Sequence, residues 1–186
     1  EDGPFERARF FHPQGLAWDE RAEALYVADT ENHLIRRVDM KSGEVSSVLG
    51  TGVQGGRSSG GRGVSLAINS PWDLLLLDGR LIIAMAGPHQ LWSFDLESGQ
   101  AAPLAGSGWE DLRDGPAMEA ALAQPSGLST DGRTVYFADS ETSSIRKLEN
   151  GRVSTLVGEG LFEFGDIDGS RSEERRVGKE CSLPCR

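Results

Sequence analysis

The sequence contains few cysteines and no redox motif. Cys181 and Cys185 are the only cysteines among 186 residues, and both lie close to the end of the sequence. A Cys-x₃-Cys without a second Cys or His pair is a poor zinc motif, and no Cys-x-x-Cys is present. We therefore predict no metal, no cofactor and no disulfide framework.

Basic stripes and long apolar runs are also missing. The 29 Asp and Glu residues outnumber the 19 Lys and Arg residues, which gives a net charge of −10. Neither nucleic acid nor an anionic membrane is therefore an expected partner. No apolar run approaches the roughly 20 residues of a membrane-spanning helix. Glu1 is not an initiator methionine, so we expect the sequence to continue upstream.

Helical periodicity is scarce, and a repeat takes its place. The phrase Tyr-Val-Ala-Asp-Thr at 26–30 returns as Tyr-Phe-Ala-Asp-Ser at 136–140, and a weaker copy lies at 81–92. A fixed period of this kind indicates a repeat architecture. Each copy is closed by Gly-x-Gly and opened by a proline, namely Pro13, Pro71 and Pro125.

Each copy is predicted to form four short antiparallel strands. Asp-Gly at 78–79 and 131–132 and Asn-Gly at 150–151 are strong hairpin signals. Four-stranded units repeated in this way are typical of β-propeller blades, so the predicted fold class is all-β. Since a closed ring has about 4–8 blades, three copies indicate a propeller fragment. Its uncovered faces are expected to make it unstable, aggregated or dimeric when it is produced alone.

The repeat also sets the expected domain boundaries. The propeller fragment is predicted at 1–170, with copies at about 2–59, 60–113 and 114–169. Residues 171–186 break the repeat and are expected to be a non-native or disordered tail.

The repeated phrases resemble the NHL repeat. Pro-x-Gly-Leu at 13–16, Tyr-Val-Ala-Asp-Thr-x-Asn-His-x-Ile-Arg at 26–36 and Gly-x-Val-Ser-x-Val-Leu-Gly at 43–50 carry this resemblance. The copies at 69–73 and 84–92 are similar to the NHL repeat-containing protein 2 family and its bacterial relatives. The resemblance implies a six-bladed propeller, a thioredoxin-like domain upstream, often a small β domain downstream, and a cytoplasmic location.

Candidate binding residues are expected at one end of the blades. In an antiparallel meander, the loop after the second strand of each copy shares a face with the long connectors at 52–63 and 108–117. The expected partner is a protein or peptide, and a small ligand is the second possibility. The candidate residues are Gln14, Trp72, Asp73 and Ser126 at the channel mouth, Trp109 as an exposed aromatic anchor, and His33 and His89 in the loops.

Two acid–base pairs recur at equal spacing. Asp29 precedes Arg36 as Asp139 precedes Arg146, whereas the middle copy has methionine and tryptophan at those places. The joint replacement indicates structural ion pairs within hairpins, exchanged for an apolar pair in the middle copy.

An enzyme is the alternative. Propeller hydrolases and lyases hold a metal on the channel axis, and His33 and His89 occupy matching positions in two copies. The third copy has Ser143 instead, and the middles of the first strands offer no metal ligand. We therefore predict a non-catalytic binding or scaffold module over a lactonase-like enzyme. The glycine-rich segment 55–61 is expected to be a flexible loop.

Overall fold

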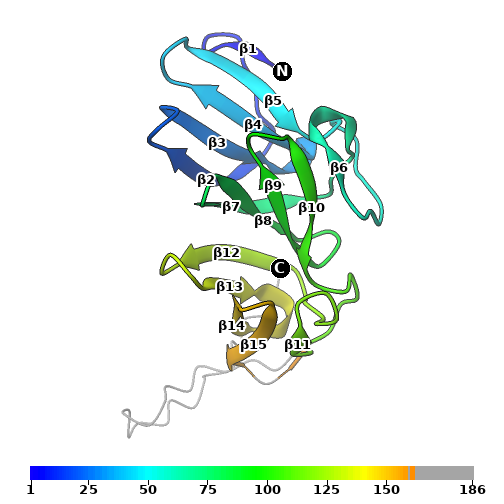
Figure 1. The fold of residues 1–186 in the computed structure, drawn as a ribbon. Helices are drawn as coiled ribbons and strands as arrows, with labels where there is room; N and C mark the ends of the chain where they lie inside the picture. Colours follow the sequence, from blue (N-terminus) through cyan, green and yellow to red (C-terminus); the bar gives the residue numbers. More distant parts are fainter. Residues whose placement is uncertain (159, 162–186) are drawn as a thin grey trace, which may run out of the picture.

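The described residues form three antiparallel sheets that follow one another along the chain (Figure 1). The computed structural model describes residues 1–158, 160 and 161. The predicted tail at 171–186 and the end of the third copy at 162–169 lie outside these residues. The predicted all-β propeller architecture is confirmed, and each sheet is one blade.

Every blade has five strands. The first strand along the chain lies at one edge and pairs with the fifth, and the fifth also pairs with the fourth. Blade 1 contains β1 (Gly3–Pro4), β2 (Pro13–Asp19), β3 (Ala24–Asp29), β4 (Leu34–Asp39) and β5 (Glu44–Leu49), in the order β1-β5-β4-β3-β2. Blade 2 contains β6 (Gly61–Arg62), β7 (Pro71–Leu77), β8 (Arg80–Met85), β9 (Gln90–Asp95) and β10 (Gln100–Ala105). Blade 3 contains β11 (Gly115–Pro116), β12 (Pro125–Thr130), β13 (Val135–Asp139), β14 (Ser144–Glu149) and β15 (Arg152–Val157). Three 3₁₀ turns complete the structure: η1 (Thr30–Asn32), η2 (Gly63–Ser65) and η3 (Ser140–Thr142).

The prediction of four strands per copy missed the short edge strand. In blades 1 and 3 this strand is the Gly-Pro of an Asp-Gly-Pro motif, which pairs with the outermost long strand β5 or β15. Proline lacks an amide hydrogen, so within sheets it is confined to edge strands such as this one, to strand starts and to bulges. The connector thus covers the open edge of the outer strand before it turns inward to the proline that begins the next long strand.

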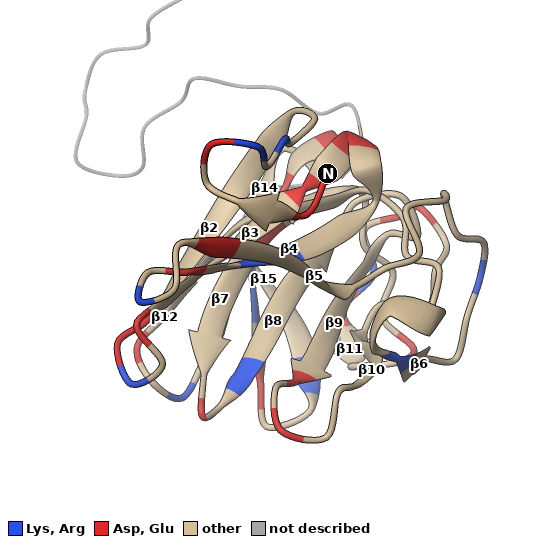
Figure 2. Cartoon of the chain, turned by 90° about the horizontal axis from the view of Figure 1, so that it is seen from above, with Lys and Arg blue, Asp and Glu red and all other residues tan. Residues whose placement is uncertain are grey.

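The blades pack face to face around their first long strands. β2 contacts β7, and β7 contacts β12. Two apolar cores fill the spaces between blades, and the charged residues concentrate in the turns and at strand ends (Figure 2). The core between blades 1 and 2 includes Tyr26, Ala28, Ile35, Leu49, Leu74, Ile83, Trp92 and Phe94. The core between blades 2 and 3 includes Ile82, Ala84, Leu91, Ala105, Leu122, Val135 and Phe137.

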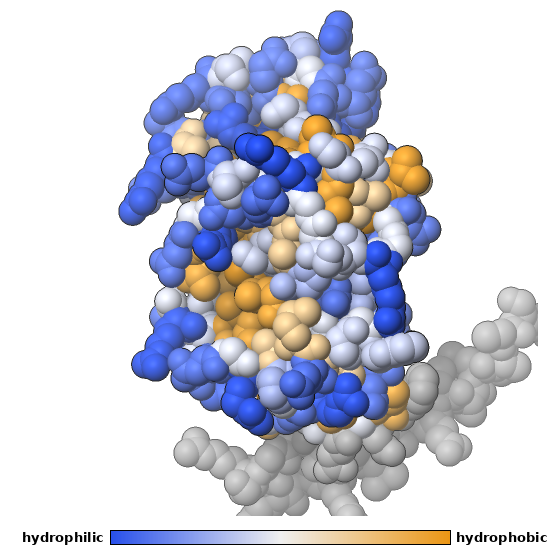
Figure 3. All heavy atoms as spheres, turned by 45° about the vertical axis from the view of Figure 1, so that its right-hand side comes forward, coloured by the Kyte–Doolittle hydropathy of each residue, from blue (hydrophilic) through white to orange (hydrophobic). Residues whose placement is uncertain are grey.

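Residues at equivalent positions in the three blades show which blade faces are buried against a neighbouring blade. Ile35 and Leu91 lie at the same register in β4 and β9, and both have an exposed fraction of 0% because the next blade covers them. Ile145 holds this register in β14 and is 45% exposed. On the opposite side of the molecule, Leu16 of β2 is 57% exposed, whereas Leu74, its counterpart in β7, is 4% exposed. Apolar patches of this kind interrupt the hydrophilic surface (Figure 3).

The matched positions predict unequal costs of truncation. We expect Leu91→Ala to lower the free energy of unfolding by about 2–5 kcal/mol, because it opens a cavity between two blades. We expect Ile145→Ala to cost less than about 1 kcal/mol, because its side chain is half exposed. Urea unfolding at low protein concentration measures both, and equal losses would contradict the assignment of these faces.

Candidate functional site

The loops that follow the second long strand of each blade end in left-handed residues. His33 follows η1 with φ of +51°, His89 has φ of +54°, and Ser143 follows η3 with φ of +48°. Non-glycine residues with such φ values are uncommon, and they indicate a local conformation that the surrounding structure enforces. Each of these residues turns the chain back into the third long strand of its blade.

The side chains of His33 and His89 form hydrogen bonds between neighbouring blades. Nδ1 of His33 accepts a hydrogen bond from the backbone N–H of Ser70 (3.1 Å), and Nδ1 of His89 accepts one from Gln124 (3.2 Å). Both donors lie directly before the proline that starts the first long strand of the next blade. The buried hydroxyl of Thr30 adds a further bond to the carbonyl oxygen of Pro71, at 2.7 Å. A neutral imidazole whose Nδ1 accepts an N–H carries its proton on Nε2, so neither nitrogen offers a free lone pair to a metal, and these geometries do not support the axial-metal alternative.

Asp73 connects three blades near the predicted channel mouth. Its Oδ2 accepts a hydrogen bond from the backbone N–H of Leu128 in β12, at 2.7 Å. On the other side, a Cβ atom on Gly15 of β2 would overlap the Cα of Asp73. Glycine is therefore required at position 15, and Asp73 acts in the described residues as a link between first long strands.

The other residues predicted at the mouth are not joined into one polar cluster. Gln14 is exposed, and Trp72 is half-buried. The hydroxyl of Ser126 lies 2.8 Å from that of Ser140 in η3. Within the described part of the chain, no hydrogen bond connects Gln14 or the Trp72 side chain to Asp73 or Ser126.

The two repeated acid–base pairs are fully buried ion pairs. Arg36 Nη1 lies 2.9 Å from Asp29 Oδ2, and Arg146 Nη1 lies 2.7 Å from Asp139 Oδ2. The second oxygen of each aspartate accepts a backbone N–H from the connector, from Phe11 in blade 1 and from Ala123 in blade 3. The pairs therefore do more than close a hairpin, because they also hold the incoming chain.

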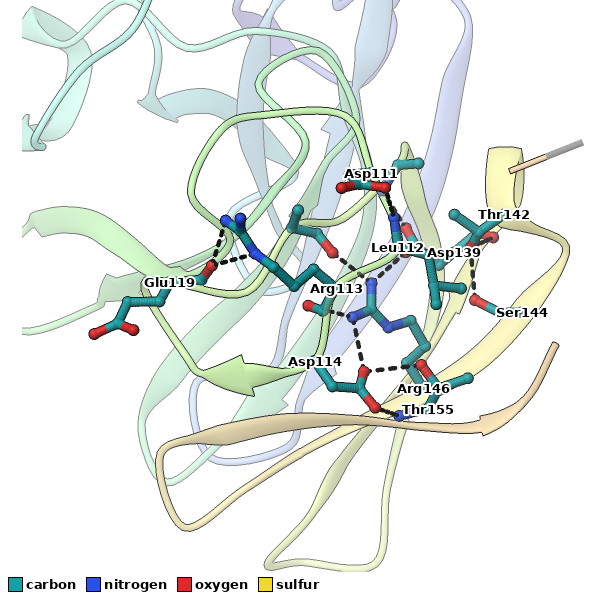
Figure 4. A network of polar contacts seen from close by, with 12 residues as sticks. Asp111, Leu112, Arg113, Asp114, Glu119, Asp139, Thr142, Ser144, Arg146 and Thr155 are labelled. Atoms are coloured by element: carbon teal, nitrogen blue, oxygen red, sulfur yellow. Dashed lines mark hydrogen bonds and ion pairs between the residues drawn. The ribbon is translucent and has the colours of Figure 1, made fainter. Parts of the chain in front are cut away.

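Each arginine holds a connector as well as its aspartate partner, and Figure 4 shows the contacts of Arg146. Arg146 donates to the carbonyl oxygens of Ala121 and Arg113 and pairs with Asp114 at 3.1 Å. Asp114 in turn accepts bonds from the backbone N–H and the hydroxyl of Thr155 in β15. Blade 1 repeats this arrangement. There, Arg36 bonds to the carbonyl oxygens of Arg9 and Glu1 and pairs with Asp2, which accepts from Ser47.

The two carboxylates on Arg146 respond to their surroundings in opposite directions. Burial raises the pKa of Asp139 above its ordinary value, although Arg146 and the Ala123 amide oppose this change. Burial also opposes the ionisation of Asp114, but hydrogen bonds from Thr155 and Arg146 prevail and lower its pKa. The stabilisation from Asp114 is therefore present above its unfolded pKa and lost as the pH falls through its folded pKa, whereas protonation of Asp139 on acidification favours the folded state.

We call this arrangement the clamp: a buried arginine, Arg36 or Arg146, that holds both its aspartate partner and the incoming connector. The sequence analysis did not predict it. A signal for it existed, because the middle copy lacks both the Asp-Gly-Pro motif and the acid–base pair. There, Trp92 Nε1 donates to Gln90 Oε1 (2.9 Å), and Gln90 Nε2 donates to the carbonyl oxygen of Gly106 (2.8 Å). Met85 and Trp92 both lie in the core between blades 1 and 2, so an apolar arrangement replaces the clamp in blade 2.

Trp109 lies on the loop face with an arginine beside it. Its side chain is 64% exposed, and the guanidinium carbon of Arg57 lies 4.2 Å from the centre of its ring. In the glycine-rich segment that carries Arg57, Gly55 is packed whereas Gly56, Arg57 and Ser59 are exposed, and the flexibility of this segment stays a prediction. Gly55 is buried, donates its N–H to the carbonyl oxygen of Ile68 at 2.9 Å, and has no room for a Cβ atom beside Ala67.

No group of three or more His, Cys, Asp or Glu side chains within residues 1–158 is arranged to hold a metal ion. Within the same part of the chain, no helix has the length and apolarity needed to cross a membrane.

The chain has clear relatives among curated proteins, although no family model matches it. It is 41% identical to the protein SUPPRESSOR OF QUENCHING 1, chloroplastic, of Arabidopsis thaliana, over 93% of this chain and 18% of that protein. It is 40% identical to NHL repeat-containing protein 2 of Homo sapiens, over 91% of this chain and 27% of that protein. The corresponding Gallus gallus protein is also 40% identical, and the chain covers 28% of it. The chain thus spans less than a third of the length of these relatives.

Solved structures share the fold. A protein of unknown function from Bacteroides thetaiotaomicron is 26% identical, with a TM-score of 0.61 over 79% of this chain and 36% of that chain. A gluconolactonase from Xanthomonas campestris has a TM-score of 0.56 at 16% identity, over 81% of this chain and 48% of the enzyme. The nidogen/laminin complex gives a TM-score of 0.59 at 18% identity, over 86% of this chain and 59% of the matched chain. At these last two identities the likeness shows the fold and not the activity.

The clamp predicts strong coupling between its members. Asp139→Ala should lower the free energy of unfolding by about 3–5 kcal/mol, because it leaves a buried guanidinium without its partner. The double variant Asp139→Met with Arg146→Trp copies the middle blade, and we expect it to cost less than the sum of the two single variants. Urea unfolding tests this, with Glu20→Ala as the control, since Glu20 is exposed in a turn and forms no side-chain hydrogen bond or ion pair within the described residues. Additive losses would contradict the clamp.

The hydrogen bond from the Ser70 amide to His33 predicts that this amide is protected from hydrogen exchange. His33→Ala should speed hydrogen exchange at the Ser70 amide by about tenfold or more, because a partly buried N–H loses an acceptor worth about 1–3 kcal/mol. His12→Ala, at another histidine with positive φ, is the matched control. An unchanged exchange rate at Ser70 in the His33 variant would rule out a stabilising role for this hydrogen bond.

Proposed function

Because this chain belongs to the NHL-repeat β-propellers and is homologous to NHL repeat-containing protein 2, we propose that it is a non-catalytic module that binds a protein or peptide through its loop face. The parent protein, on this proposal, also carries a thioredoxin-like domain. The loop face consists of η1, the turn at 86–89, η3 and the two long connectors at 50–60 and 106–114.

The proposal rests on the role of the polar side chains, which hold blades and connectors together. His33, His89 and Asp73, which could serve an axial metal, make hydrogen bonds that join blades. The buried arginines Arg36 and Arg146 likewise hold connectors. Polar groups that fix the scaffold in this way favour a rigid platform, on which binding residues lie in loops.

Exposed groups on the loop face supply the means of binding. Trp109 is exposed on the connector after blade 2, and exposed aromatic residues are frequent anchors in protein interfaces. The net charge of −10 disfavours nucleic acid and anionic surfaces as partners. A cytoplasmic location stays a prediction, since one relative is named as a chloroplast protein.

Site-specific photocrosslinking tests the proposal. A photoreactive residue at Glu31 or Glu110 on the loop face should give a discrete protein adduct in lysate of cells that express the protein. The same residue at Arg21, in the hairpin turn at the other end of blade 1, should give none. Equal labelling from both ends, or no adduct from the loop face, would contradict the proposal.

An enzyme assay tests the alternative function, a lactonase-like enzyme with a metal on the channel axis. Hydrolysis of gluconolactone by the purified protein should stay at the buffer rate with and without added Ca²⁺ or Zn²⁺. A metal-dependent rate that Asp73→Asn removes would instead establish a lactonase of the kind that shares this fold.

A further inference from the structure

A small hollow on the loop face is built by two connectors that are far apart in the sequence. It is lined by Arg57, Ser58 and Ser59 from one connector, Ser107 and Gly108 from the next, and Pro88 and Gln90 from blade 2. Its volume is about 290 Å³. That is at or below the lower limit of small-molecule sites, which run from about 300 to 1,000 Å³, and it suits an inserted side chain better than a cofactor.

Arg57 is held in place at one edge of this hollow. Its Nη2 donates to the carbonyl oxygen of Gly108 at 3.0 Å, and its guanidinium lies against the ring of Trp109. Backbone packing fixes the segment on either side of it, because Gly55 lies against Ala67 and Gly60 against Ala101. The arginine therefore reaches the hollow from a packed loop, in an orientation set by a stacking contact and a hydrogen bond.

The guanidinium retains unused donors. Within residues 1–158, no carboxylate forms an ion pair with Arg57, and the bond to Gly108 uses one of its five N–H groups. Arg57 is the one charged residue among those that line the hollow, and Ser58, Ser59 and Ser107 line it as well. A cation with free donors in a hollow that is also lined by serines is suited to an oxyanion.

The surroundings favour a single carboxylate over a more highly charged group. Glu110 and Asp111 follow Trp109 directly, and the whole chain carries a net charge of −10, so a dianionic phosphate or a polyanion would meet repulsion. The exposed part of the Trp109 ring offers an apolar contact beside the cation. A ligand that satisfies both features carries one carboxylate next to an apolar side chain.

We propose that this hollow is the docking site for a peptide segment of the partner protein, with a glutamate or aspartate side chain on Arg57 and a neighbouring apolar side chain on Trp109. This assignment rests on the proposed function, of which it names the site and the chemistry of the ligand. The carboxylate accepts hydrogen bonds from the free guanidinium N–H groups and from the serine hydroxyls.

Nuclear magnetic resonance with two matched peptides tests the proposal. Acetyl-Ala-Glu-Leu-amide should shift the indole N–H of Trp109 and the Nε–H of Arg57 in a saturable way, with a dissociation constant on the order of millimolar. The isosteric acetyl-Ala-Gln-Leu-amide should bind about tenfold more weakly, because it lacks the charge.

Variants assign the effect to the hollow. Arg57→Gln should weaken the glutamate peptide about tenfold and remove the preference over glutamine, and Trp109→Ala should weaken both peptides alike. Arg133→Gln, in the hairpin turn of blade 3, should leave both affinities unchanged. Thermal unfolding of each variant checks that the fold is retained.

Several outcomes would overturn the proposal. Equal binding of the two peptides, or binding that survives Arg57→Gln, would remove the carboxylate contact. Saturable shifts of the same signals by inorganic phosphate but not by the glutamate peptide would show an anion site of another kind. If no probe shifts these signals while Glu31 still crosslinks a partner, this site fails and loop-face binding stands. If crosslinking fails as well, both proposals fail.

Discussion

The structure depends on the fact that a blade is apolar on both of its faces. A single twisted sheet can cover neither face by itself, and the buried residues of β8 lie on alternate sides, with Leu81 and Ile83 in the core toward blade 1 and Ile82 and Ala84 in the core toward blade 3. Within the described residues, the contacts between blades give two separate cores. Ile145 and Leu16 mark where the pattern reaches the outer blades, with apolar side chains at positions that are buried between blades elsewhere.

Polar interactions decide how the apolar blades are joined. Apolar faces alone would allow neighbouring sheets to slide, since hydrophobic contacts have no direction. The imidazoles of His33 and His89, the carboxylate of Asp73 and the buried arginines each fix one atom of one blade or connector to another. These bonds set the register between blades.

The connectors of the loop face are anchored to the blades. Each connector adds a short strand to the outer edge of a blade and then crosses to the inner strand, and in blades 1 and 3 an arginine holds it on the way. Arg57 and Trp109 lie on two successive connectors and meet at the second blade. A contact between loops that are themselves anchored provides a defined surface, which is what recognition of a partner requires.

Residue types and their spacing determined the architecture. The repeated prolines, the Tyr-Val-Ala-Asp phrase and the Asp-Gly turns specify strands and hairpins through local conformational preferences, and these preferences operate within a few residues. They also indicated that Asp29 pairs with Arg36 and Asp139 with Arg146, because both partners lie in one hairpin. Tertiary structure alone decided what each repeated motif contacts. The Asp-Gly-Pro motif meets its arginine from 32 residues away or more, His33 meets the N–H of Ser70 in another blade, and Arg57 meets Trp109 across two connectors. Such contacts depend on how whole blades stack, which no short-range preference encodes.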